Sequence, residues 1–404
     1  MNSAISMLPA AKIPYGTWGS SFFPGWQTSA LAEVNMGQFA GESMARILAL
    51  RGVPKSELDY LVIGSTIPWH WKFWNAPLVA SCLGQRLPGY HVEQACATGL
   101  QAVLQGGAEI QSGSSEVVGV LTFDRTSDSP VGVFPERRAH ERTFAISDVW
   151  DNFGFDPATG NAMIAAAGIT ARKYKTDRRE IDEATFLRYE QYFESRRNGF
   201  LDRVLVPLDV LNVQGRPLGR IDDDLGVREV SLGALRAMRE LDTCVTSGSQ
   251  THASDGMACL LVTNPEKARQ LSRCPEIDIS FVAKTEVRAH PSLMPEAPGL
   301  AVRKLLSRTG LTMADMSVVK SHNPFAVNDV VFARMLDYDW RDMNRTGCSL
   351  VWGHPQGPTL TRILIESLEE AASLGGGYAL VFGCAAGDVG IAALFRVSEE
   401  DDRS

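Results

Sequence analysis

The sequence lacks any uninterrupted apolar run of the roughly 18–20 residues that a membrane-spanning helix needs, so we expect no membrane span. Its first residues, 1–13, contain no positively charged segment followed by a long apolar stretch, and they therefore do not resemble a secretion signal. Its content of hydrophobic residues, 45%, is ordinary for a folded globular protein. These features predict a soluble protein of the cytoplasm.

Positive charge and paired cysteines are also scarce. The formal net charge is −8, with 39 Lys and Arg against 47 Asp and Glu. Proteins that bind nucleic acids need clustered cations to neutralise phosphates, so this class of partner is not expected. The seven cysteines are an odd number and form no CxxC pair, which argues against a disulfide framework and a zinc site. We expect no bound metal.

The chain is long, and it carries a repeated pattern of elements. At 404 residues it exceeds what one hydrophobic core usually organises, so two core-forming units are expected. Each half shows the order strand, strand-like segment, helix and strand. The first half shows it in residues 60–64, 91–96, 100–112 and 117–123, and the second in residues 317–320, 349–354, 360–374 and 378–382. This alternation predicts α/β layers, with apolar strands covered on both faces.

The segment between the two halves breaks this pattern. It contains a charged helical run at 177–196 and a polar loop at 212–227. We interpret it as an inserted domain that covers a ligand. The expected boundaries are residues 1–123 with about 244–270 for the first half, 124–243 for the insertion and 271–404 for the second half.

Four short motifs combine a reactive side chain with small residues or proline. They are residues 95–100 around Cys96, 353–357 around His354, 383–390 around Cys384 and 321–326 around His322. A cysteine at a strand-to-helix corner lies near exposed amides and the helix dipole, which stabilise a thiolate. Taken alone, each motif is equally typical of a structural role: packing for the cysteines, a turn for His354 and a helix cap before Pro324.

In their order and spacing, the four motifs resemble the four sequence blocks of the thiolase family. The resemblance covers nearly the whole chain, because residues 12–16 are similar to the family's Arg-Thr-Pro-hydrophobic-Gly opening and 246–256 to a block beside bound coenzyme A. Residues 322–325 and 123–125 are closer to the sterol-carrier-protein-2 type than to common thiolases. The last block also departs from the family pattern, since Cys-x-Gly-Gly-Gly is replaced by Cys-Ala-Ala-Gly-Asp at 384–388.

The resemblance implies a thiolase fold, in which two duplicated βαβαβαββ halves form a five-layer αβαβα core with an inserted loop domain. It also implies an acyltransferase that cleaves 3-ketoacyl-CoA with coenzyme A, or runs the reverse Claisen condensation with acetyl-CoA. Cys96 would be the nucleophile and His354 its base. Cys384 would exchange a proton with the acetyl-CoA carbanion, and His322 would replace the usual asparagine that holds a water.

The resemblance further implies two sets of hydrogen-bond donors and a coenzyme A site. The backbone amides of Cys96 and Ala386 would bind the oxyanion of the acyl-enzyme step, and His354 with His322 the enolate. The family's contacts to coenzyme A correspond loosely to Met163, Arg228, Thr251 and Phe325. No cofactor is implied beyond the coenzyme A thioesters themselves. A homodimer or homotetramer with a role in fatty acid and lipid metabolism is expected.

Two other functions stay open on the sequence alone. One is a thiolase-like aldolase or lyase subunit that works with a small OB-fold acyl-CoA-binding protein, and the other is a non-catalytic acyl-CoA-binding protein. Both typically lack a reactive cysteine, whereas this chain has Cys96 and Cys384 together with His354. An aromatic cluster at 69–74 is expected at a dimer contact, with a wall of the acyl pocket as the alternative.

Overall fold

The computed structural model describes residues 10–28, 30–128, 130–138 and 141–399. Residues 1–9, on which the expected absence of a secretion signal largely depends, lie outside the described residues. Within the described ranges, no helix combines the length and the apolar character that crossing a membrane requires.

The first half of the chain builds a five-stranded sheet in the order β1-β11-β4-β2-β3. Its strands are β1 (Gly19–Ser20), β2 (Tyr60–Gly64), β3 (Gly89–Val92), β4 (Val117–Arg125) and β11 (Asp255–Thr263). Strand β2 pairs in parallel with β3 and β4, and β11 runs antiparallel to β4 and β1. Strands β4 and β11 are buried along nearly their whole length, because helices cover both faces of the sheet.

The second half builds a smaller sheet in the order β12-β15-β14-β13. Its strands are β12 (Ile277–Arg288), β13 (Met316–His322), β14 (Gly377–Ala385) and β15 (Val389–Glu399). Strand β14 pairs in parallel with β13 and antiparallel with β15. These pairings match those of β4 with β2 and β11, so the structure confirms that the two halves repeat one arrangement.

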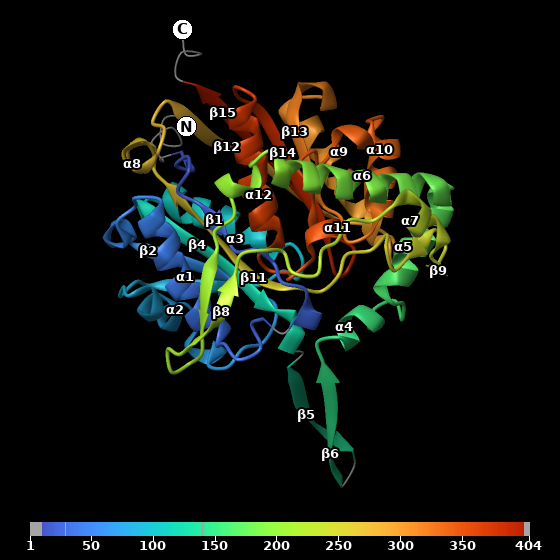
Figure 1. The fold of residues 1–404 in the computed structure, drawn as a ribbon, viewed down its shortest axis with the longest axis horizontal. Coiled ribbons are helices and arrows are strands. Elements are labelled where there is room, and N and C mark those ends of the chain that lie inside the picture. The colour runs from blue at the N-terminus through green and yellow to red at the C-terminus, as the bar shows by residue number, and fades with distance from the viewer. Residues whose placement is uncertain (1–9, 29, 129, 139–140, 400–404) are drawn as a thin grey trace, which may run out of the picture.

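Helices form three layers around the two sheets (Figure 1). The outer helices are α1 (Met36–Leu50) and α2 (Asn75–Leu83) on the first sheet, and α9 (Ala297–Thr309) with α10 (Ala326–Leu336) on the second. The central layer contains α3 (Thr98–Gln111) and α12 (Thr359–Ser373), which pack against each other. A Cβ at Gly99 would lie 2.6 Å from the Gly357 carbonyl oxygen, so only glycine allows this close approach of the two halves.

One predicted element has a different structure. The strand-like segment 349–354 is a short helix, α11 (Ser349–Trp352), so within the described residues the second half lacks the third strand of the βαβαβαββ pattern. All four residues of α11 are buried. A buried segment this short shows no repeating pattern of apolar and polar residues that would distinguish a helix from a strand in the sequence. Similarly, β3 ends at Val92, and Cys96 follows it in a turn.

The segment between β4 and β11 is rich in helices and hairpins. It contains a projecting hairpin of β5 (Val131–Arg138) and β6 (Glu141–Asp148), seen in Figure 1. The other elements are α4 (Asp151–Gly154), α5 (Met163–Tyr174), α6 (Arg178–Arg197), β7 (Leu208–Leu211), β8 (Pro217–Ile221), α7 (Leu232–Ala237), β9 (Glu240–Asp242) and β10 (Val245–Thr246), and α8 (Pro265–Leu271) follows β11. The charged helix predicted at 177–196 is α6, whereas the predicted loop 212–227 contains β8.

Buried ion pairs connect this segment to the central helix α12. Arg362 donates to both oxygens of Asp224 at 2.9 and 3.0 Å, and Asp224 also accepts a hydrogen bond from the Tyr192 hydroxyl at 2.9 Å. Arg362 also pairs with Glu366, which accepts from Lys320 at 2.7 Å, and all these charges are fully buried. Buried charges are tolerated only when they are paired and hydrogen-bonded. The network therefore fixes Asp224 and Tyr192 over the central layer.

Candidate active site

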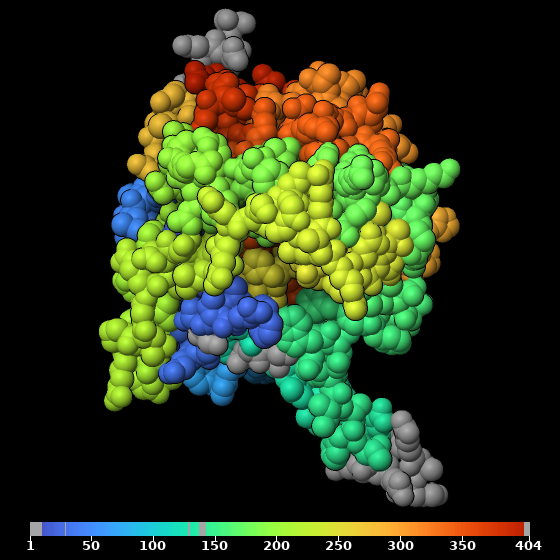
Figure 2. All heavy atoms as spheres, turned by 45° about the vertical axis from the view of Figure 1, so that its right-hand side comes forward, coloured from blue at the N-terminus to red at the C-terminus, as the bar shows by residue number. Residues whose placement is uncertain are grey.

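Two cavities meet at Cys96, with volumes of about 400 and 320 Å³. Both are lined by Cys96, Phe153, Met163 and Met294. Figure 2 shows that this face of the molecule is hollowed between the yellow-green segment before β11 and the blue N-terminal segment. Cavities of this size suit small-molecule ligands.

Cys96 lies in a tight turn between β3 and α3. The preceding residue, Ala95, has a left-handed backbone with φ of 44°, a conformation that is uncommon for a residue with a side chain. The amide of Gln94 donates to the Thr98 hydroxyl at 2.7 Å and closes the turn. Strain of this kind persists only where surrounding contacts fix it, and it is concentrated at functional sites.

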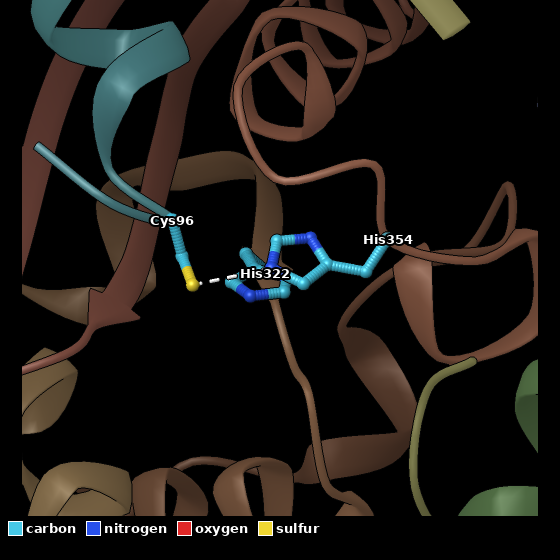
Figure 3. Close-up of side chains that lie close together, drawn as sticks. All are labelled: Cys96, His322 and His354. Carbon is cyan, nitrogen blue, oxygen red and sulfur yellow. Dashed lines mark hydrogen bonds between the residues drawn. The ribbon is translucent and has the colours of Figure 1, made fainter. Parts of the chain in front are cut away.

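His354 reaches Cys96 from the other half of the molecule. Its amide donates to the His252 carbonyl at 2.8 Å, and Gly353 before it has φ of 95°, which glycine accommodates without strain. The His354 ring nitrogen Nε2 lies 3.1 Å from Cys96 Sγ (Figure 3). The other ring nitrogen, Nδ1, lies 2.7 Å from the Thr359 hydroxyl at the start of α12.

Burial keeps both members of this pair neutral at rest. It raises the pKa of the Cys96 thiol to about 12, although the amides of Ala386 and Cys96 act in the opposite direction. Burial also lowers the pKa of His354 to about 3. With both groups neutral, we assign the shared proton to sulfur, so that the thiol donates to Nε2 and Nδ1–H donates to Thr359.

His322 packs against His354. The two rings are stacked, with centroids 4.1 Å apart and an interplanar angle of 28°. His322 Nδ1 lies 2.9 Å from the Ser349 hydroxyl of α11, whereas Nε2 is buried with no hydrogen-bond partner among the described residues. Burial, and then the neighbouring His354, hold the pKa of His322 well below its usual value. His322 lines neither cavity, but its unpaired buried nitrogen is left to bond a ligand atom that comes close to the His354 ring.

The same three side chains bring one ligand atom each within 4.8 Å of one another, which raises the question of a metal. A tetrahedral zinc ion needs nitrogen lone pairs that converge on one point at about 2.0–2.1 Å. The lone pairs of stacked imidazoles lie in nearly parallel planes and do not converge. The residues therefore do not fit a metal ion in this arrangement.

Cys384 lies near the end of β14, is buried, and lines the second cavity together with His354. The side-chain amide of Asn328 on α10 donates to Cys384 Sγ at 3.4 Å. Burial, and then the nearby Cys96, raise the pKa of this thiol, while the Asn328 hydrogen bond acts against them. Asn328 is thus placed to stabilise a thiolate at Cys384 when a proton leaves.

Asp124 joins the two halves behind Cys96. This carboxylate accepts hydrogen bonds from the Thr66 amide and hydroxyl, the Ile67 amide and the Gly357 amide, at 2.7–2.9 Å. Burial raises its pKa to about 7, and the four donors act to lower it. Because Gly357 follows His354 by three residues, Asp124 fixes the turn that carries the histidine.

The structure brings most of the predicted site residues together. Met163 lines both cavities, Thr251 and Phe325 line the second, and Ala386 lines the first. Arg228 is exposed and lines neither cavity. Within the described residues, the aromatic cluster at 69–74 also lines neither, so it does not form a wall of this site.

Four buried partners of the site were missed from the sequence: Asp124, Asn328, Ser349 and Thr359. Asn328 lies six residues from His322, and Ser349 and Thr359 each lie five residues from His354. Asp124 lies in the segment 123–125, which was noted only for its resemblance to one type of thiolase. Polar residues of these types are common, so nothing in the sequence marks these four as part of a site. Only the contacts with Cys384, His322 and His354, and for Asp124 the contact with Gly357, reveal them.

Comparison with known proteins agrees with this geometry. The thiolase N-terminal domain family matches residues 24–266, and the thiolase C-terminal domain family matches residues 277–397. The chain belongs to the thiolase family. The predicted thiolase fold and the prediction of a thiolase-type acyltransferase are thereby confirmed.

Individual thiolases are similar to this chain over most of their length. It is 24% identical to an acetyl-CoA acetyltransferase of Synechocystis, covering 90% of this chain and 92% of that protein. It is 25% identical to a probable acetyl-CoA acyltransferase of Staphylococcus aureus, covering 91% and 92%.

Solved thiolase structures share the fold. The acetyl-CoA acetyltransferase of Bacillus anthracis superimposes with a TM-score of 0.87 at 23% identity, covering 96% of this chain and 99% of that one. Human mitochondrial 3-ketoacyl-CoA thiolase in complex with CoA gives 0.83 at 20% identity, covering 96% and 98%. At these identities the thiolase fold is shared, and the substrate has to be argued from this chain's own residues.

Proposed function

We propose that this thiolase cleaves 3-ketoacyl-CoA with coenzyme A, or condenses acyl-CoA with acetyl-CoA, through an acyl thioester on Cys96. The observation that carries the proposal is the 3.1 Å contact of Cys96 Sγ with His354 Nε2, beside a second cavity that also contains Cys384. A nucleophile within hydrogen-bond reach of a base, which is itself oriented by a third group, is the general arrangement for covalent catalysis.

In the first step, Cys96 attacks the 3-keto carbon while His354 Nε2 takes the thiol proton. Because both groups are neutral at rest, proton transfer accompanies the attack and no preformed thiolate is needed. The amides of Cys96 and Ala386 point at Sγ and donate to the carbonyl oxygen as it gains charge. The bond between C2 and C3 then breaks, and its electrons remain on the acetyl-CoA enolate.

In the second step, Cys384 gives its proton to C2 of the enolate. The thiolate that remains keeps the hydrogen bond from Asn328. The enolate oxygen accepts from protonated His354 and from His322 Nε2, whose proton is available when the Ser349 hydroxyl donates to Nδ1. Coenzyme A then attacks the acyl thioester as its thiol proton passes to the Cys384 thiolate. Cys96 leaves and takes back the proton held by His354, and condensation is the same sequence reversed.

We place the pantetheine arm of coenzyme A in the second cavity, against Met163, Thr251 and Phe325. The exposed Arg228 is proposed only as a contact for the phosphates outside this cavity. Retention of Cys96, His354 and Cys384 in one place supports a catalytic protein over a binding protein or a lyase subunit. The role in fatty acid and lipid metabolism, the cytoplasmic location, the homo-oligomer, a dimer contact at 69–74 and an OB-fold partner stay predictions.

The test is thiolysis of 3-ketoacyl-CoA by wild type and by Cys96→Ser, with mass spectrometry of the protein after incubation with acyl-CoA. We expect an acyl adduct on Cys96 in the wild type, and a loss of activity of at least about 10³-fold in the variant. Cys82→Ser, at a half-buried cysteine outside both cavities, is the matched control and should behave as wild type. Undiminished thiolysis by Cys96→Ser would refute the mechanism.

A further inference from the structure

The two cavities at Cys96 carry different chemical groups. His354 and Cys384 line only the second cavity, whereas Ala386, whose amide points at Cys96 Sγ, lines only the first. Acid–base groups therefore stand on one side of the nucleophile, and an oxyanion donor stands on the side of the larger cavity.

This division orients the substrate, if the proposed function holds. The carbon that Cys96 attacks bears three substituents: an oxygen, the C2 carbon of the leaving acetyl-CoA, and the acyl chain. C2 has to lie beside Cys384, which protonates it, and the oxygen has to lie at the amides of Cys96 and Ala386. The first cavity is therefore the space that remains for the acyl chain.

The first cavity is far larger than an acetyl group needs. Its volume is about 400 Å³, and at the ~30 Å³ that one water molecule occupies in the liquid it has room for roughly a dozen non-hydrogen atoms. Acetoacetyl-CoA would place a single methyl group there. The remaining space would hold water against apolar side chains, which is unfavourable.

The walls of the first cavity combine apolar and polar residues. Its buried apolar residues are Ile67, Val149, Ala166 and Met294. Its buried polar residues include Ser292, whose hydroxyl accepts a hydrogen bond from the side-chain amide of Asn161 at 2.8 Å. Glu93 and Phe155 are among the exposed residues of the lining, and Glu93 is paired with Lys72 at 3.0 Å. The buried apolar residues favour hydrocarbon, and a tail longer than the cavity would extend past the exposed residues into solvent.

We propose that the acyl group that this thiolase transfers is a medium-length chain, of roughly six to twelve carbons by the volume argument, rather than acetyl. The acyl chain lies in the first cavity, with its hydrocarbon against Ile67, Val149, Ala166 and Met294 and its end toward the exposed lining residues. The inference rests on the proposed function and deepens it, because it names the substrate class of the same site.

The test compares thiolysis of acetoacetyl-, 3-ketohexanoyl-, 3-ketooctanoyl-, 3-ketodecanoyl- and 3-ketohexadecanoyl-CoA. Each buried methylene contributes a factor of up to about four, so kcat/KM should rise at least ~10-fold from acetoacetyl- to 3-ketooctanoyl-CoA. It should fall again for 3-ketohexadecanoyl-CoA. A maximum at acetoacetyl-CoA would overturn the inference.

Two variants on helix α5 test whether the acyl chain of the substrate lies in the first cavity. Ala166→Leu fills the first cavity, and Ile164→Phe, two residues away, alters only the second. We expect Ala166→Leu to lower the ratio of kcat/KM for 3-ketooctanoyl- to acetoacetyl-CoA at least ~10-fold, since the side chain displaces about three methylenes of substrate. Ile164→Phe should change both substrates by the same factor. An unchanged ratio in Ala166→Leu would refute the placement, and Ala166→Val repeats the test if the larger variant does not fold.

Mass spectrometry separates failure of this inference from failure of the proposed function. Hexanoyl-Cys96 formed from 3-ketooctanoyl-CoA, which loses two carbons as acetyl-CoA, supports both. Acetyl-Cys96 formed from acetoacetyl-CoA, without hexanoyl-Cys96 from 3-ketooctanoyl-CoA, overturns only the chain-length inference. No adduct on Cys96 from any substrate overturns the proposed function itself.

Discussion

The hydrogen bond between Thr359 and His354 gives the sharpest test of how the base is held. Thr359→Val keeps the shape of the side chain and removes the hydroxyl that lies 2.7 Å from His354 Nδ1. The amide of Thr359 still donates to the Gln356 carbonyl, so the start of α12 is retained. The substitution therefore acts on the histidine ring and leaves the helix start in place.

The expected magnitude follows from the tautomer. With Nδ1–H donating to Thr359, the lone pair of Nε2 faces Cys96, as a base requires. Leaving a buried donor without its partner costs about 1–3 kcal/mol, which favours moving the proton to Nε2, where the ring cannot accept from the thiol. At 1.4 kcal/mol for each factor of ten, we expect kcat to fall roughly 5- to 100-fold. KM should change little, since Thr359 lines neither cavity.

The assay is steady-state thiolysis by wild type, Thr359→Val and Thr359→Ser, together with the rate of acyl-Cys96 formation. Thr359→Ser keeps the hydroxyl and should recover most of the activity that Thr359→Val loses. If Thr359→Val retains kcat within a factor of two of the wild type, the tautomer assignment and the role of Thr359 are both incorrect.

Three further predictions concern the neighbours of the base. Cys384→Ala should still form acyl-Cys96 from acyl-CoA, but its rate of thiolysis should fall about 10²–10⁴-fold. It should also stop exchanging the C2 protons of acetyl-CoA with deuterated solvent, and normal exchange would contradict the role of Cys384. His322→Asn should keep measurable thiolysis with altered substrate preference, and complete inactivity would show that the histidine does what asparagine cannot. Asp124→Asn should gain thermal stability relative to wild type as pH rises from 5 to 8. Burial raises the pKa of Asp124 to about 7 from an ordinary 3.8, so the native state binds more protons than the unfolded chain and loses stability over this range. A difference in melting temperature that does not depend on pH would contradict this account.

The four candidate residues that the structure brings together could be predicted because each stands inside a local motif. Cys96, His354, Cys384 and His322 are flanked by Gly, Pro or other small residues that mark sharp turns, and the family spacing assigned them jointly. The strands and central helices were also found, since long apolar runs and helical periods are strong signals. By contrast, the segment that became α11 is a run of four buried residues that carries no period.

The partners that orient these residues could not be predicted. Thr359, Ser349 and Asn328 are polar residues of common types, and only the fold determines which ring or thiol each one contacts. Asp124 is separated by more than two hundred residues from the Gly357 amide that it accepts. The division of the site into two cavities depends on how α4 and α5 pack over Cys96, and no short stretch of sequence records that packing.

One segment, residues 149–166, lines both cavities, so substitutions within it can change which substrates a thiolase of this type accepts. Residues 149–166 supply half of the larger cavity's lining and also residues of the smaller one, whereas the nucleophile and its acid–base partners come from the two sheets and their adjoining turns. One continuous stretch can therefore accumulate substitutions that retune acyl preference while the reactive groups stay unchanged. A chimera that takes only this stretch from a relative of different specificity should inherit the donor's preference and keep the recipient's chemistry.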